Sequence, residues 1–405
     1  MPANLAALLV LLHAQGPAPA PKEERQPDFS AARRVLEDAI RDRAFPGCAV
    51  AVGTSRGPWW KEGLGRLDYG SGPESTPRTL YDLASLTKVV GTTCVVMALV
   101  RDGKMAIEDP VSRHVPGFSG GKKAEVEIAH CLSHSSGLPA WRAVHLEARG
   151  YREVLARVLA TDLEAAPGTR EAYSDLGFML LGEAAARAGG KSLAELEREL
   201  VLDPLGLADT ARTVPEKDLA RTAPTEKLAS PRAGAAVPRP GEDFTRGVVH
   251  DENAAAAGGG TGHAGLFSTA DDLAVLAAEL LRARTGKSRI FPAPLLARFT
   301  SPAGIVPGSS RALGWDTPSG LSSAGSLLSR SSFGHTGFTG TSLWIDPERD
   351  IYIVLLSNRV HPTRENTKIA AVRRALADAV ALAVDASKST PPPPPHPSLR
   401  KRKRI

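Results

Sequence analysis

One segment limits the possible fold more than any other: the 15 residues from Leu86 to Val100, which read LTKVVGTTCVVMALV. Apart from Lys88, the residues of this segment are apolar or small on nearly every side of a helix. Such a helix is buried at the centre of a folded domain, so the chain must supply packed layers around it. A lysine in its first turn needs an explanation, because burial disfavours the charged form.

Strand-like runs near both ends of the chain supply one layer. The runs 48–52 and 59–67 are joined by a glycine-containing turn, and the runs 341–345 and 351–356 are joined by a turn over 346–350. A helix opening at Ser30 precedes the first pair, and a long amphipathic helix after Pro362 follows the second pair. We therefore expect an α+β fold, with an antiparallel sheet built from both ends and both terminal helices on one face.

The middle of the chain, about residues 125–290, reads differently. Helical stretches alternate there with long loops rich in proline, glycine and alanine. The predicted helices cover 151–160, 176–188, 192–200 and 270–283. This pattern predicts an all-helical region inserted into the sheet domain.

The two ends of the chain carry separate signals. An apolar run over residues 5–12 resembles the core of a signal peptide, so residues 1–25 are expected to be a leader and linker, and the protein periplasmic or secreted. Residues 387–405 hold five consecutive prolines and six cations, which predicts a disordered basic tail that could contact anionic surfaces. Because this tail accounts for the whole formal charge of +6, the body of the chain (26–386) is neutral and is not expected to bind nucleic acid. Three scattered cysteines do not indicate a disulfide framework.

Ser85 and Lys88 stand at the start of the apolar helix as an S-x-x-K pair. Residues three apart share a helix face, so the hydroxyl and the ammonium can meet. The helix N-terminus favours negative charge at Ser85, and burial is expected to lower the pKa of Lys88. A serine can be activated in this way without histidine. The alternative is that Ser85 caps the helix and Lys88 reaches out to solvent.

Two further motifs follow in the chain. Residues 167–175 form a turn that presents Tyr173 and Asp175 where a helix begins. The run Gly334-His335-Thr336-Gly337-Phe338-Thr339-Gly340 leads into a strand, and its glycines allow a ligand to approach the backbone closely.

The ordered set S-x-x-K, Y-S-D and H-T-G resembles the serine β-lactamase and penicillin-binding-protein superfamily. The tyrosine motif and the H-T-G sequence look like its class-C-like branch, which holds class C β-lactamases, D-Ala-D-Ala carboxypeptidases, D-aminopeptidases and esterases. The segments 132–139, 247–253, 262–269 and 313–315 also resemble that branch. The resemblance covers about residues 28–385.

The resemblance implies a role for each motif residue. Ser85 is the expected acylated nucleophile, and Lys88 and Tyr173 are expected to share the general base and acid work with lowered pKa values. Asp175, His335, Thr336, Gly337 and Phe338 are the expected substrate-binding residues. The backbone N–H groups of Ser85 and Phe338 are expected to form the oxyanion hole. No cofactor and no metal are implied.

Two positions depart from the commoner pattern of that branch. Asp175 stands where asparagine is commoner, and His335 stands where lysine is commoner. We expect His335 to be neutral or half-charged near pH 7, with weaker and pH-dependent recognition of a carboxylate. These features favour hydrolysis of an ester or a D-amino-acid amide in a small-molecule or peptidoglycan-derived substrate. A true class C β-lactamase and a non-catalytic sensor or cell-wall-binding module remain the alternatives.

Three other patterns carry less weight. Residues 53–57 match G-x-S-x-G but are expected to form a hairpin turn. Residues 260–265 match G-x-G-x-x-G but follow no strand. His130, Cys131 and His134 have metal-ligand spacing without an obvious fourth ligand, and His250 and His263 are expected to line or brace a loop near the site.

Overall fold

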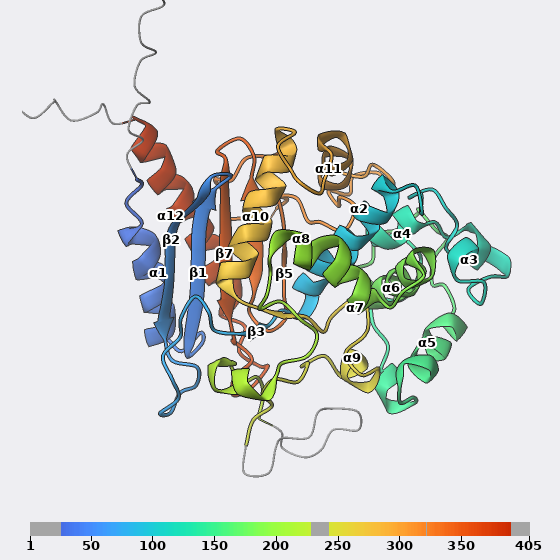
Figure 1. The fold of residues 1–405 in the computed structure, drawn as a ribbon, viewed down its shortest axis with the longest axis horizontal. Coiled ribbons are helices and arrows are strands. Elements are labelled where there is room, and N and C mark those ends of the chain that lie inside the picture. The colour runs from blue at the N-terminus through green and yellow to red at the C-terminus, as the bar shows by residue number, and fades with distance from the viewer. Residues whose placement is uncertain (1–25, 228–242, 321, 390–405) are drawn as a thin grey trace, which may run out of the picture.

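The computed structural model describes residues 26–227, 243–320 and 322–389 of the chain. The predicted leader, and the predicted tail from residue 390 onward, lie outside the described residues. The predicted α+β architecture is confirmed: a five-stranded antiparallel sheet in the order β2-β1-β7-β6-β5 lies beside a mainly helical region (Figure 1). Its strands are β1 (Gly47–Thr54), β2 (Gly57–Gly65), β5 (Phe333–Thr336), β6 (Ser342–Asp346) and β7 (Ile351–Ser357).

Strand β1 joins the two ends of the chain. It pairs with β2 on one side and with β7 on the other, so that Val50 lies opposite Leu355. Successive side chains of a strand point to opposite faces. Val50 packs with the terminal helices on one face, and Ala51 packs with the large central core on the other face. The sheet is therefore covered on both sides.

The helices that cover the sheet come from three parts of the chain. Helices α1 (Ser30–Arg41) and α12 (Ile369–Ser389) pack together on one face, as predicted (Figure 1). Helix α10 (Ala270–Arg284) lies on the opposite face against β1 and β7. The sequence places this helix in the inserted helical region, whereas in the structure it packs against the sheet. Helix α12 also continues through Ser389, three residues into the segment expected to be a disordered tail.

The helical region forms the other half of the molecule (Figure 1). Its helices are α2 (Cys94–Arg101), α3 (Val111–His114), α4 (Ile128–Leu132), α5 (Tyr151–Ala160), α6 (Asp175–Gly189), α7 (Leu193–Glu197), α8 (Asp203–Leu205), α9 (Glu252–Ala256) and α11 (Ala293–Thr300). A two-stranded sheet of β3 (Tyr81–Asp82) and β4 (Phe267–Ser268) lies between this region and the large sheet.

The central apolar segment is buried as predicted, but it is not one regular helix. It starts as a 3₁₀ turn, η1 (Ala84–Leu86), continues as a π-helix, η2 (Lys88–Thr93), and becomes regular only in α2. Side chains on the irregular part bond to the 262–266 loop: Thr92 donates to the Gly262 carbonyl, and Thr87 accepts from the Leu266 N–H. The stretch Ala84–Arg101 is long and apolar enough to suit a membrane span, yet 83% of it is buried in this fold, as in a core helix.

Two smaller expectations can be checked in the described residues. Cys48, Cys94 and Cys131 are buried and free, and they pack as small apolar residues. The G-x-S-x-G match at residues 53–57 is the turn between β1 and β2, as expected.

Candidate active site

Ser85 lies on a tightly held turn directly after β3. The preceding Ala84 has a φ of +46°, a left-handed conformation that is rare for residues other than glycine and costs free energy. The buried Asp82 carboxylate holds this turn by accepting the Ala84 N–H at 2.8 Å. The hydroxyls of Thr339 and Thr341 donate to the carbonyls of Asp82 and Leu83. The β5–β6 connection therefore positions the turn that carries Ser85.

Lys88 lies one turn further on and is fully buried. Its Nζ donates to Ser85 Oγ at 3.0 Å, to Asp175 Oδ1 at 2.7 Å and to the His263 carbonyl oxygen at 3.1 Å. These three acceptors match the three N–H bonds of an ammonium group. The structure therefore brings Ser85 and Lys88 together, and it excludes a lysine that reaches out to solvent.

The expected lowering of the Lys88 pKa is wrong. Burial alone would lower it, but the Asp175 carboxylate and the Tyr173 hydroxyl beside the ammonium outweigh burial and raise the pKa of Lys88 above its ordinary value. The expectation failed because Asp175 stands 87 residues further along the chain. Its contact with Lys88 arises only when the first turn of α6 packs against η2.

Tyr173 lies beside Lys88, whose Nζ is 4.9 Å from the centre of the phenol ring. On its other side the ring lies 4.3 Å from that of His134. His134 Nδ1 accepts the Ser174 N–H, and burial together with the positive charges of Arg311 and Lys88 holds the His134 pKa well below its usual range. A neutral His134 thus supports the tyrosine loop, in line with the structural role expected for it.

His335 lies in β5 and is almost fully buried. Its Nδ1 donates to the Thr336 carbonyl at 2.7 Å, and its ring centre is 5.9 Å from that of Tyr173. Burial, reinforced by the charges of Lys88 and Arg311, lowers the pKa of His335 to about 3. Of the two states expected near pH 7, neutral or half-charged, the structure supports the neutral one, and the pH-dependent charge does not fit this burial.

The H-T-G segment runs alongside the turn that carries Ser85. A side chain at Gly337 would lie 2.1 Å from Thr341 Oγ1 and 2.3 Å from the Leu83 carbonyl, so only glycine allows this approach. Among the described residues, the N–H groups of Ser85 and Phe338 have no hydrogen-bond partner. Two such donors on adjoining backbone segments suit an oxyanion hole.

A cavity of about 310 Å³ opens beside Ser85. Three of the expected site residues that line it are Tyr173, Asp175 and Phe338. Thr336 instead faces a neighbouring cavity together with Arg311 and Arg373, and His335 lies behind the wall. The cavity is also lined by His250, which the sequence predicts only near the site. Four further lining residues are not predicted as site residues: Trp141, Asp251, Glu252 and Arg364.

Some of these residues could have been found from the sequence. Trp141 follows the 132–139 segment, and residues 250–252 lie within the 247–253 segment, both part of the family resemblance. Arg364 gave no such signal. It reaches the site by an ion pair to Glu252 at 2.8 Å.

His250 and His263 brace the site. His263 Nε2 lies 2.8 Å from Asp251 Oδ1, and Asp251 also caps α9 by accepting the Ala254 N–H. The main-chain N–H of His250 donates to the Asp82 carboxylate, which links the loop containing residues 250 and 251 to the turn that carries Ser85. Among the described residues no group of three or more His, Cys, Asp or Glu side chains could hold a metal ion, so His130, Cys131 and His134 do not form a metal site there.

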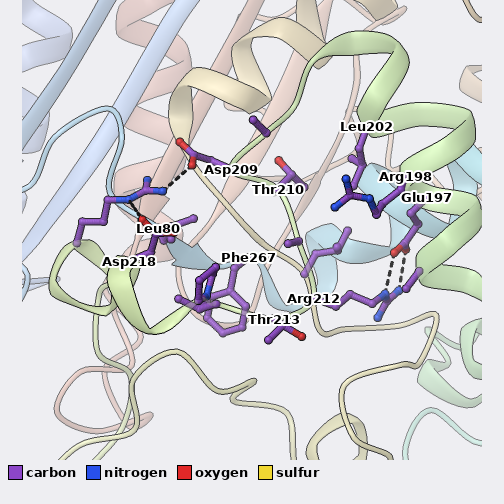
Figure 2. Close-up of a pocket in the computed structure, with 17 residues that line it drawn as sticks. Leu80, Glu197, Arg198, Leu202, Asp209, Thr210, Arg212, Thr213, Asp218 and Phe267 are labelled. Atoms are coloured by element: carbon purple, nitrogen blue, oxygen red, sulfur yellow. Dashed lines mark hydrogen bonds and ion pairs between the residues drawn. The ribbon is translucent and has the colours of Figure 1, made fainter.

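A second cavity, of about 370 Å³, lies away from Ser85 between η5 (Arg198–Leu202), β4 and the 208–221 segment (Figure 2). Two groups of ion pairs stand at its edges. Arg221 contacts Asp209 and Asp218, and Arg212 makes two contacts with Glu197. Ser85 and Tyr173 line the smaller cavity and not this one.

Comparisons with known proteins show the family and the fold. The family model described as Beta-lactamase matches residues 32–378. A curated Escherichia coli (strain K12) relative named "Putative D-alanyl-D-alanine carboxypeptidase" is 33% identical over 311 residues, which cover 71% of each chain. The solved structure of "EstCE1, a hydrolase with promiscuous acyltransferase activity" has a TM-score of 0.67 at 22% identity, covering 87% of this chain and 97% of its own. A class C β-lactamase from Rhodobacter sphaeroides has a TM-score of 0.64 at 20% identity, covering 87% and 99%.

The chain therefore belongs to the beta-lactamase family, within the superfamily of serine β-lactamases and penicillin-binding proteins. Its fold is that of the class C β-lactamase and penicillin-binding-protein structures. In class it is a beta-lactamase-family serine hydrolase, related in sequence to proteins named as D-Ala-D-Ala carboxypeptidases.

Proposed function

We propose that this protein hydrolyses an ester or a D-amino-acid amide through an acyl-enzyme on Ser85, with a D-alanyl-D-alanine-type cell-wall peptide as the preferred substrate. The observation that carries the proposal is the 3.0 Å contact between Lys88 Nζ and Ser85 Oγ at the wall of an open cavity. A serine nucleophile needs a nearby group through which its proton can leave, and Lys88 is in contact with it.

The geometry supports a division of labour in the site. The N–H groups of Ser85 and Phe338 are available to the oxygen of a tetrahedral intermediate, which lowers the barrier for both acylation and deacylation. Tyr173 lies beside Lys88 and can assist the proton transfers that pass through Lys88. Water then attacks the acyl-enzyme to release the acid and restore Ser85.

The two cavities beside Tyr173 support the choice of a peptide ending in a carboxylate. On the Thr336 side, Arg373 and Arg374 line the wall, and Arg311 is paired there with two acids, Glu171 and Asp316. The guanidinium groups of Arg373 and Arg374 suit a leaving group that carries a carboxylate, such as D-alanine. On the Ser85 side, the half-exposed rings of Trp141 and Phe338 offer apolar walls for the acyl part.

The cellular setting follows from this substrate. A cell-wall peptide is met outside the cytoplasm, which agrees with the leader expected over residues 1–25. We therefore propose a periplasmic or secreted location. Fractionation of cells that express the full chain, followed by N-terminal sequencing, is the direct test.

A substrate panel tests the activity. We expect turnover of acyl-D-Ala-D-Ala peptides and of p-nitrophenyl esters, with slower turnover of nitrocefin. A covalent adduct at Ser85 should be detected by mass spectrometry, and both turnover and adduct should be lost in Ser85→Ala. Turnover that survives Ser85→Ala contradicts the assigned nucleophile. Preferred turnover of nitrocefin would favour the class C β-lactamase alternative.

A further inference from the structure

The contact between Lys88 and Asp175 poses a problem for the proposed activation of Ser85. Lys88 Nζ has three acceptors within 3.1 Å, the closest being Asp175 Oδ1 at 2.7 Å. The geometry is that of an ammonium ion, which has no lone pair with which to accept a proton. Lys88 can therefore take the Ser85 proton only if it gives up one of its own at the same time.

The groups around Lys88 restrict where that proton can go. The His263 carbonyl is not basic, and the Tyr173 hydroxyl beside the ammonium can take up a proton only after it has lost its own. Asp251 lies close enough to act electrostatically on Lys88 but is hydrogen-bonded to His263 and to the α9 N-terminus. The other charged or titratable groups that face the pair are His134, His335 and Arg311. The closest available base is the Asp175 carboxylate.

We propose that Asp175 is the terminal proton acceptor for Ser85, acting through Lys88. This inference rests on the proposed acyl-enzyme at Ser85. As Ser85 Oγ bonds to the substrate carbonyl carbon, its proton passes to Lys88 Nζ while another Nζ proton passes to Asp175. Lys88 remains an ammonium ion beside the oxyanion, and Asp175 becomes a neutral acid. When the bond to the leaving group breaks, the proton returns from Asp175 through Lys88 to that group.

Deacylation follows the same route in reverse. Water bonds to the acyl carbon and delivers its proton through Lys88 to Asp175, and the departing Ser85 oxygen then recovers that proton. The position of Asp175 suits this role. It is the first residue of α6, directly beside Lys88, and its side chain keeps 17% exposure towards the cavity.

The isosteric variant Asp175→Asn tests the relay in the full chain. The readout is the rate of Ser85 acylation by p-nitrophenyl acetate between pH 5 and pH 9.5. In the wild type we expect a rate that rises at acidic pH and is flat from about pH 6 to pH 9. In the variant, buried Lys88 has lost its partner and must act as a neutral amine. The limb should therefore move to alkaline pH, with a loss of roughly 100-fold at pH 6 and less than 10-fold at pH 9.

Two further variants make the test decisive. Asp175→Glu keeps the carboxylate and should restore part of the rate at pH 6. Glu183→Gln makes the same acid-to-amide change further along α6, where the carboxylate contacts Tyr151 and Arg187, and should leave the pH profile unchanged.

The possible failures are distinguishable. If Asp175→Asn lowers the rate equally at every pH, Asp175 only orients Lys88 and the relay is wrong, although the proposed function stands. The same holds if the variant reacts like the wild type. If the wild type forms no adduct at Ser85, the proposed function and the relay fall together.

Discussion

Two buried ion pairs lie at the π-helix η2, and they are built differently. The pair Lys88–Asp175 has one contact of 2.7 Å, and the carboxylate faces an open cavity. The pair Arg212–Glu197 has two contacts of 2.7 Å, and both side chains are at most 8% exposed (Figure 2). The first pair leaves room for a proton to move, whereas the second has the two-point geometry that holds a structure in place.

The two pairs are linked by one loop. Arg212 Nη1 donates to the carbonyl oxygens of Gly259, Thr261 and Ala264. The same loop presents the His263 carbonyl to Lys88. A buried charge that collects several carbonyls fixes the loop backbone, so the structural pair supports the geometry of the chemical pair.

Breaking each pair separately has the largest expected effects and is the strongest test of this comparison. Lys88→Ala should lower kcat/KM for p-nitrophenyl acetate roughly 1,000-fold, because it removes the proton route. Arg212→Ala should instead cost about 3–5 kcal/mol of unfolding free energy, because Glu197 stays buried without its partner. Activity assays and urea denaturation of both variants measure the two effects.

Arg221→Ala is the matched control for the structural pair. Arg221 stands at the edge of the same cavity as Arg212, but 26% of its side chain is exposed. Its removal should cost about 1 kcal/mol or less. Equal destabilisation by Arg212→Ala and Arg221→Ala would contradict the special status of the Arg212–Glu197 pair.

A substitution at Gly91 in η2 tests how closely Glu197 packs against this helix. A Cβ at this position would lie 2.2 Å from Glu197 Oε1 and 2.9 Å from Leu266 Cδ1. Gly91→Ala should therefore push Glu197 away from Arg212 and destabilise the protein by about 2–3 kcal/mol. Thermal melting measures the loss, with Gly103→Ala as a contrast, because a Cβ at Gly103 would meet no atom within 4 Å.

A stable Gly91→Ala protein would show that the tight contact is not needed. Gly103 has a φ of +68°, so Gly103→Ala carries a backbone cost of its own, of about 1 kcal/mol. The comparison therefore depends on the excess loss at Gly91.

The sequence predicted local relationships better than distant ones. Ser85 and Lys88 are three residues apart, so their contact followed from helix geometry. The strands and terminal helices followed from their own periodicity. The pKa direction of Lys88 did not follow, because it depends on Asp175 in another helix. Arg212 and Glu197 carried no motif, and only the packing of α7 (Leu193–Glu197) beside η2 reveals their role.

Burial was the second quantity that local patterns could not supply. The sequence left open whether His335 is neutral or half-charged near pH 7, whereas the fold buries it and keeps it neutral. The regular helix expected over 86–100 also gave way to a π-turn, where side-chain bonds from Thr87 and Thr92 to the 262–266 loop compete with the helical pattern. In both cases tertiary contacts overrode a sound local preference.

The last prediction concerns the pH dependence of stability that arises from the neutral His335. A buried histidine whose pKa is about 3 binds fewer protons in the folded state than in the unfolded state, where its pKa is near 6.5. Its contribution to stability is therefore complete above about pH 6.5 and is lost as the pH falls towards 3. Between pH 7 and pH 5 this loss amounts to about 1–2 kcal/mol.

The variant His335→Gln isolates this contribution. Glutamine can donate a hydrogen bond but does not titrate, so the variant should lose less stability than the wild type between pH 7 and pH 5. Urea denaturation at both pH values measures the difference. His114→Gln is the comparison, because this histidine contacts the Asp109 carboxylate far from Lys88 in the chain. An equal pH slope in the wild type and in His335→Gln would mean that His335 is charged beside Lys88.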